Sequence, residues 1–191
     1  MEMRRLRTQI VSAAALVVFA TSTAGAGVNE RLSHPIAVCG LSPGYATDGA
    51  IQRLYGKGLF IADEDHGGGR YFVDPQHQIT LHTTIGVDKV ISLVECSEGV
   101  QLPSSDASSM KLAVTARLKP PKRIIRDLQF GASISDVKRV YGSPKRDETV
   151  HGERILQYSF KPNGGTSDYE YYVRFGFKRG RLAKVSAYNG E

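Results

Sequence analysis

The densest group of side chains that could bind a metal ion or a partner is the run Asp63, Glu64, Asp65 and His66, which three glycines follow. Carboxylates and an imidazole are potential metal ligands, but the run lacks the ligand spacing of a calcium-binding EF-hand loop. Glycines 67–69 precede an expected strand instead of opening a helix, so they lack the helix N-terminus that favours anions. We therefore predict a polar loop that is a candidate contact for a partner, and no metal site.

The sequence contains no recognisable catalytic motif. Its five histidines are scattered, and His77 and His82 are five residues apart, which places them on opposite faces of a strand and argues against joint metal binding. It has no Gly-x-Ser-x-Gly elbow, no Walker motif and no His-Glu-x-x-His pair. We predict no catalytic residues, no metal and no cofactor. The alternative is an enzyme whose site is assembled from distant residues, with His66 or His151 beside a nucleophile.

Two cysteines, Cys39 and Cys96, are the only ones in the chain. An even pair in an exported protein favours a disulfide over a metal site, which needs more ligands nearby. On the chain-entropy estimate, closing a loop of this length contributes about 4 kcal/mol. Two free buried thiols and a redox function are the alternatives.

A basic run surrounds the two prolines at 120–121. Such a run could contact anionic lipid headgroups or acidic polysaccharide, but it lacks the interleaved aromatic residues typical of single-stranded nucleic-acid binding. An exported protein also seldom meets nucleic acid, so no nucleic-acid partner is expected, and a solvated linker is the alternative. The candidate anion-binding residues are Lys119, Lys122, Arg123 and Arg126.

Three tyrosines, Tyr169, Tyr171 and Tyr172, lie close together in one expected strand. Because side chains alternate between the faces of a strand, these rings must occupy both faces. One face could then contact a partner, and packing in the core is the alternative.

The first 26 residues have the parts of a secretory signal peptide. Three arginines precede an apolar run over 10–20, and Ala24-Gly25-Ala26 fits a cleavage site. The apolar run is short for a bilayer span, which argues against the alternative of a membrane anchor. We expect a periplasmic or secreted protein, cleaved near Ala26 and monomeric. Residues 27–118 carry 7 Lys/Arg against 10 Asp/Glu, whereas 119–191 carry 15 against 8, which suggests a charged partner surface or a solvated surface with no partner.

Two short helices are expected to position these residues. Ser133 and Asp136 have the spacing of a capping box, an apolar stripe follows, and Gly142 and Pro144 end the helix. The stripe is expected to pack on the apolar face of its sheet, which comprises Leu156, Tyr158, Val173, Phe175, Leu182 and Val185. Residues 50–58 repeat the apolar spacing and the Tyr-Gly stop. Strand patterns follow each helix, at 70–73, 78–84 and 89–96 after the first, and at 154–160, 169–177 and 182–188 after the second; 110–118 is a further expected strand.

This repetition predicts a duplicated α+β fold. It would have two tandem modules, each a short helix packed on a three- to four-stranded antiparallel sheet. The expected domains are a signal peptide (1–26), a first module (27–100), a linker with a strand (101–118) and a second module (119–191).

The second half resembles the SmpA/OmlA family, which includes the small lipoprotein of the outer-membrane barrel-assembly machine. The resemblance covers about 60 residues and consists of a Gly-x-Ser-x-x-Asp-Val-x-x-x-Tyr-Gly-x-Pro pattern over 131–144, then Leu156-x-Tyr158 and Phe175-x-Phe177-x-x-Gly180-x-Leu182-x-x-Val185. The tandem arrangement is similar to the secreted β-lactamase-inhibitor family, whose fold is two such modules side by side. The chain departs from both families, because it has no lipid-anchor cysteine at the cleavage site and no cysteine in the second half. No binding residue is carried over.

Together these observations predict an exported, non-catalytic protein-binding module of the cell envelope. The resemblance adds the alternative of a secreted hydrolase inhibitor, in which the loop over 63–69 would project from the sheet.

Overall fold

In the computed structural model, residues 36–63, 67–103, 107–115, 118, 124–161 and 170–190 are described. They form three short helices and eight strands. In chain order these are α1 (Asp48–Tyr55), β1 (Leu59–Ile61), β2 (Gly68–Asp74), β3 (Ile79–Ile85), β4 (Ile91–Glu98), α2 (Ala107–Ala113), α3 (Ile134–Tyr141), β5 (Arg146–Val150), β6 (Glu153–Phe160), β7 (Glu170–Lys178) and β8 (Arg181–Gly190).

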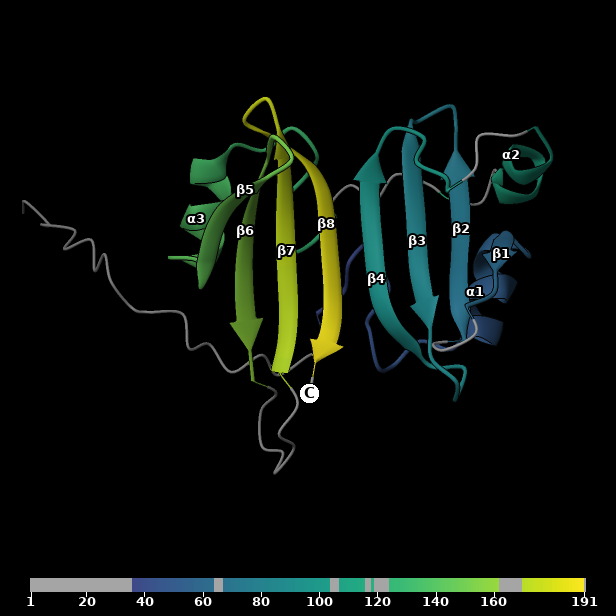
Figure 1. Cartoon of the computed structure of the whole chain (residues 1–191). Helices are drawn as coiled ribbons and strands as arrows, with labels where there is room; N and C mark the ends of the chain where they lie inside the picture. Colours follow the sequence, from purple (N-terminus) through teal and green to yellow (C-terminus); the bar gives the residue numbers. More distant parts are fainter. Residues whose placement is uncertain are drawn as a thin grey trace, which may run out of the picture.

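All eight strands belong to one antiparallel sheet with the order β1-β2-β3-β4-β8-β7-β6-β5 (Figure 1). Each half is a four-stranded meander that one helix precedes, and the two meanders meet at β4 and β8. At this seam Cys96 lies opposite Val185 and Val94 lies opposite Ala187. Both edges of the sheet are therefore formed by strands that come early in their half, β1 and β5.

The predicted fold of two separate helix-on-sheet modules is wrong. The short helices and most strands are present, but the sheet is continuous and the protein is mostly β. An unpaired strand edge exposes a row of backbone N–H and C=O groups. Pairing β4 with β8 satisfies those groups and joins the two halves around one hydrophobic core.

The helix α3 begins where the sequence indicates. The Ser133 hydroxyl accepts a hydrogen bond from the Asp136 N–H at 3.2 Å, and the Ser133 N–H donates to the Asp136 carboxylate at 3.0 Å. This capping box confirms the predicted start of the helix. At the other end Gly142 has a φ of 77° and its N–H donates to the Lys138 carbonyl, which ends the helix.

Three local elements differ from the expectation. Residues 110–118 were predicted to form a strand, but Ala107–Ala113 is helical, and only Val114 forms a bridge to the sheet, beside Val73. The helix buries Ala113 and leaves Leu112 exposed, so the apparent alternation of apolar residues does not reflect a sheet face. The short edge strands β1 and β5 were missed, and all five residues of β5 are exposed.

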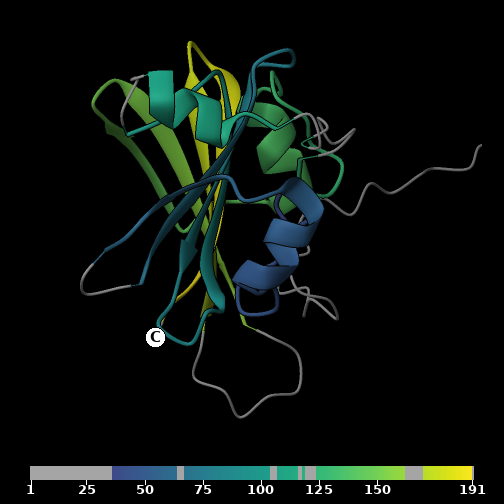
Figure 2. The same ribbon diagram turned by 90° about the vertical axis from the view of Figure 1, so that its right-hand side faces the viewer.

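One side of the sheet carries the main core. Val137 and Tyr141 of α3 and Ile51 of α1 pack there on buried residues of both meanders. This bears out the predicted core of the second half, which comprises Leu156, Tyr158, Val173, Phe175, Leu182 and Val185. Figure 2 shows α1 and α3 on this side and α2 on the opposite side. Within the described ranges, no helix is both long and apolar enough to cross a membrane.

Candidate binding surface

The side of the sheet away from α1 and α3 is here called the open face. Helix α2 covers it only near β1 and β2, where Ala113 packs on Leu59 and Val73. Further across the sheet, no helix of the described chain covers this side (Figure 1). The strand register aligns one row of open-face side chains from β1 to β5, which consists of Leu59, Tyr71, His82, Glu95, Ser186, Arg174, Gln157 and Arg146.

Two tyrosines on the open face form a stack that a cation flanks at each end. Tyr172 of β7 and Tyr188 of β8 are cross-strand neighbours whose ring centroids are 5.1 Å apart with planes at 16°. The Arg174 guanidinium carbon lies 5.0 Å from the Tyr188 ring centroid, and Lys145 Nζ lies 5.6 Å from that of Tyr172. Cations are attracted to the faces of aromatic rings, so the four side chains support one another. We call Arg174, Tyr188, Tyr172 and Lys145 the tyrosine stack.

The two cations of the tyrosine stack differ in their polar partners. Lys145 Nζ lies 3.4 Å from a Glu170 carboxylate oxygen, so its charge is compensated locally. The Arg174 Nε donates to Gln157 Oε1 at 2.9 Å. No carboxylate in the described part of the chain pairs with Arg174. Arg174 is exposed, and Gln157 and Tyr188 hold its guanidinium in place. The guanidinium can therefore bind a carboxylate of another molecule.

A second polar group lies near the seam between β4 and β8. Glu95 Oε2 lies 3.8 Å from Lys184 Nζ, and Glu153 approaches from β6. Burial raises the pKa of Glu95, Lys184 opposes the shift and Glu153 adds to it. Glu153 Oε1 is buried and has no hydrogen-bond partner among the described residues. Two acidic side chains and one lysine are thus gathered at the centre of the open face, and the lysine pairs with Glu95.

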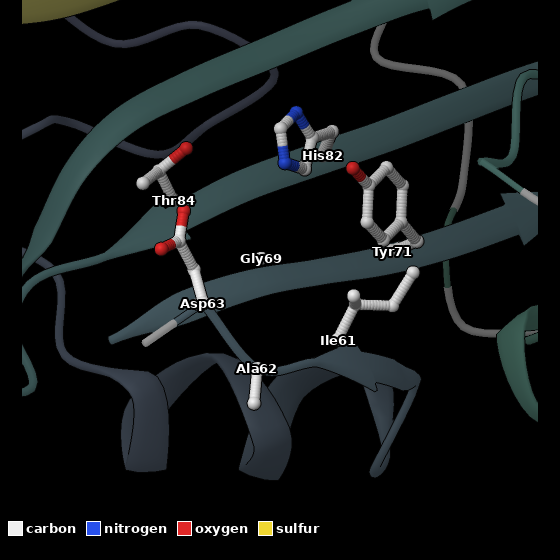
Figure 3. A pocket seen from close by; sticks show the side chains of 8 residues that line it. Ile61, Ala62, Asp63, Gly69, Tyr71, His82 and Thr84 are labelled. Carbon is white, nitrogen blue, oxygen red and sulfur yellow. The ribbon is translucent and has the colours of Figure 1, made fainter. Parts of the chain in front are cut away.

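A cavity of about 570 Å³ opens on this face beside β1 (Figure 3). Tyr71 and His82 stack at one end with centroids 4.2 Å apart and planes at 7°. Burial lowers the pKa of His82 to about 4, so this imidazole is neutral near pH 7. The cavity is lined by Ile61, Ala62, Asp63, Gly68, Gly69, Tyr71, His82 and Thr84.

The predicted polar loop is described only in part. Asp63 lies at the cavity, at the opposite end from the Tyr71–His82 stack (Figure 3). Glu64, Asp65 and His66 lie outside the described residues. Their role as partner contacts stays a prediction.

The three clustered tyrosines separate as alternation requires. Tyr172 lies on the open face, whereas Tyr171 packs against the core on the other face. Burial raises the pKa of Tyr171 to about 12, and a hydrogen bond with Tyr45 adds to the shift. Tyr169 lies outside the described residues. Of the two described tyrosines, Tyr172 is the one placed beside other side chains that suit a partner.

The candidate anion site is also described only in part. Lys119, Lys122 and Arg123 lie outside the described residues. The Arg126 guanidinium carbon lies 5.2 Å from the Tyr141 ring centroid, next to the core. Arg126 therefore has an aromatic contact of its own, and the anion-binding role of the group stays a prediction.

Cys39 and Cys96 form a disulfide, which is consistent with the pairing expected from the sequence. The bridge joins the segment before α1 to β4 at the seam. No group of three or more metal-ligating side chains is present in the described ranges.

Sequence reasoning missed most residues of the open face. Tyr188, Arg174 and Lys145 belong with Tyr172, but their proximity depends on the β7–β8 register and on the approach of the segment before β5. One local signal was available. Lys184, Ser186 and Tyr188 alternate with buried Ala183, Val185 and Ala187, which marks one side of β8 as polar.

Comparison with known proteins identifies no family for the chain. No family model matches it, and no curated protein matches it in sequence. Among solved structures, the chain is similar to a DUF4309 family protein (YjgB) from Bacillus subtilis subsp. subtilis str. 168, at 12% identity and a TM-score of 0.46. The similarity covers 79% of this chain and 83% of the other. The resemblance to the SmpA/OmlA family stays a prediction.

Proposed function

We propose that the protein is an exported, non-catalytic binding module that docks a partner protein on the open face of its sheet. The tyrosine stack is the observation that carries this proposal. Tyrosine and arginine are enriched among the residues that dominate binding energy at protein interfaces. Here they are gathered on a side of the sheet that the described helices leave uncovered over β3 to β8.

The rings and the guanidinium are already ordered in the unbound chain. Tyr172 and Tyr188 support each other by stacking, and Gln157 holds the Arg174 side chain. Ordering side chains on binding costs conformational entropy, so a preorganised patch loses less free energy when a partner docks.

The charges on the stack indicate the chemistry of the partner. Arg174 offers a planar guanidinium with no carboxylate partner among the described residues, and a guanidinium can donate two parallel hydrogen bonds to a carboxylate. The partner should therefore present an aspartate, a glutamate or a C-terminal carboxylate beside an apolar group that packs on the exposed parts of Tyr172 and Tyr188.

Affinity capture with matched variants tests the proposal. The purified protein is immobilised and exposed to an extract of its source cells, and capture is compared with that by an Arg174→Glu, Tyr188→Ala double variant. Loss of the Arg174 and Tyr188 side chains should weaken binding of the partner by at least about 30-fold. Arg139→Glu is the control, since it makes the same charge change at an exposed position on α3, where the Arg139 side chain is 76% exposed.

A partner that both variants retain equally would contradict the open face as the docking site. Concentration-dependent self-association that only the double variant abolishes would also overturn the proposal, because the occupant would then be a second copy of the chain. If the captured protein is a secreted hydrolase, measuring its activity with and without the chain decides whether the module inhibits it.

A further inference from the structure

The floor of the cavity beside β1 is open because Gly69 has no side chain. Gly69 of β2 and Thr84 of β3 are cross-strand partners, one step along the sheet from the stacked pair of Tyr71 and His82. A Cβ atom at Gly69 would lie 3.0 Å from His82 Nε2 and 3.3 Å from a Tyr71 ring carbon. The glycine thus leaves open the space into which His82 Nε2 and the Tyr71 ring face.

Three neutral polar side chains line this space, those of Tyr71, His82 and Thr84. Within the described residues, no side-chain hydrogen bond reaches the Tyr71 hydroxyl, the His82 imidazole nitrogens or the Thr84 hydroxyl. The imidazole is half-buried and stays neutral, because burial lowers its pKa to about 4. The three side chains are partly exposed and line the cavity, so their polar groups are accessible to a ligand.

The remaining walls are apolar or acidic. Ile61 and Ala62 give an apolar side, and Asp63 adds a carboxylate. The volume of about 570 Å³ falls in the range of roughly 300–1,000 Å³ that is typical of small-molecule sites. The site combines a flat aromatic surface, an apolar wall and several hydrogen-bonding groups around one small space.

We propose that this cavity binds a neutral pyranose sugar. A sugar ring has an apolar face of C–H groups that can pack on the part of the stacked Tyr71 and His82 rings that faces the cavity, and hydroxyl groups that both donate and accept. Those hydroxyls match the neutral imidazole of His82, which offers one donor and one acceptor, and the hydroxyls of Tyr71 and Thr84. The site lies beside β1, away from the tyrosine stack on β7 and β8, and it does not depend on a protein partner.

The charges of the cavity disfavour other ligand classes. None of its eight lining residues is a lysine or arginine, and Asp63 is acidic, so an anionic ligand gains no ion pair. A cationic group could approach Asp63 but would leave the polar groups of His82 and Thr84 unmatched. A purely apolar ligand would bury all three neutral polar groups without partners, which costs free energy.

Nuclear magnetic resonance of the isotope-labelled full chain tests the proposal. The probes are methyl β-glucopyranoside, N-acetylglucosamine and methyl α-mannopyranoside, each titrated to millimolar concentration, with glucuronate and glucosamine as charged counterparts. The expected result is a saturable shift of the His82 imidazole nitrogen signals with at least one neutral sugar, and weaker shifts with both charged ones.

Three variants locate the binding. Gly69→Val fills the floor and should abolish the shift. Tyr71→Phe keeps the ring and removes the hydroxyl, and should weaken binding about three- to tenfold. Tyr172→Phe makes the same change on the far side of the open face and should leave binding unaltered. Amide spectra of each variant establish that it is folded.

The proposal is overturned if none of the neutral sugars shifts the His82 signals of the unaltered chain. It is also overturned if Gly69→Val binds as well as the unaltered chain, or if glucosamine or glucuronate binds more tightly than its neutral counterpart. The last result would identify a site for a charged group, such as a basic or acidic side chain of a protein.

Discussion

Arg70 and Asp48 form a two-pronged ion pair between β2 and the first turn of α1. Nε lies 2.6 Å from Oδ1, and Nη2 lies 2.9 Å from Oδ2. Arg70 is only 7% exposed, and its Nη1 also donates to the Lys57 carbonyl. One buried guanidinium therefore holds both the helix and the chain before β1 against the sheet.

Asp48→Asn should be strongly destabilising. It leaves the buried Arg70 charge without its counter-charge, and breaking such a pair costs about 3 kcal/mol or more. Denaturant unfolding measures the change. Glu170→Gln is the comparison, since it removes the exposed pair with Lys145, where we expect a cost below about 1 kcal/mol. Equal costs for the two variants would argue against this role of Arg70.

The disulfide should contribute substantially to stability. Cys39 and Cys96 are separated by 57 residues, and closing a loop of that length in the unfolded chain is worth about 4 kcal/mol on the entropy model. Both residues are buried. A Cys39→Ser, Cys96→Ser double variant should therefore unfold at lower denaturant concentration than the oxidised chain, and unchanged stability would contradict the estimate.

Removing the hydroxyl should change the stability of the protein differently at two neighbouring tyrosines. Tyr158 donates to the Gly142 carbonyl at 3.1 Å, so Tyr158→Phe should cost about 1 kcal/mol. The Tyr141 hydroxyl is buried and has no hydrogen-bond partner in the described part of the chain. Tyr141→Phe should therefore be neutral or stabilising, and calorimetry of both variants measures the difference. A similar loss of stability in both variants would imply that an ordered water molecule hydrogen-bonds to the Tyr141 hydroxyl.

Local sequence patterns predicted the parts of the fold that depend on neighbouring residues. Ser133 and Asp136 are three residues apart and form their capping box within one turn. The alternating apolar residues of β6, β7 and β8 correctly gave the core of the second half.

The arrangement of the sheet depends on contacts between distant residues. The seam pairs Cys96 with Val185, and nothing local to either strand specifies the other as its neighbour. The strand β5 has no buried residue, so its sequence lacks the alternation by which strands are recognised. The helix α2 is stabilised by packing Ala113 against Leu59 and Val73, which overrides the alternation of 110–118.

The same limit applies to the candidate surface. Tyr172 was recognised because tyrosines cluster near it in the sequence. Tyr188 and Arg174 join it only through the β7–β8 register and side-chain packing. His82 was considered as a metal ligand, whereas its neighbours Tyr71 and Gly69 come from another strand and create a neutral cavity.

His82 should make the protein sensitive to mild acid. Its pKa is about 4 in the folded chain, against about 6.5 in the unfolded chain. As pH falls below 6.5, the unfolded state takes up a proton that the folded state resists, so stability decreases until the pH reaches about 4. The loss is at most about 3.5 kcal/mol, because each pKa unit corresponds to about 1.4 kcal/mol.

Glu95, which lies directly opposite His82 on β4, opposes this trend. Its pKa is raised in the folded chain, so its contribution to stability falls as pH rises above the unfolded value near 4.5. Measuring unfolding free energies from pH 4 to 7 for the unaltered chain and for His82→Phe separates the two effects, because phenylalanine keeps a ring beside Tyr71 but does not titrate. The variant should lose the decrease that begins at pH 6.5, and between pH 6.5 and 5, above the range in which the carboxylates of lowered pKa take up protons, Glu95 should make it slightly more stable towards acid. If both proteins lose the same stability over this range, the imidazole is not the group that resists protonation, and the cavity beside it is more polar than its lining implies.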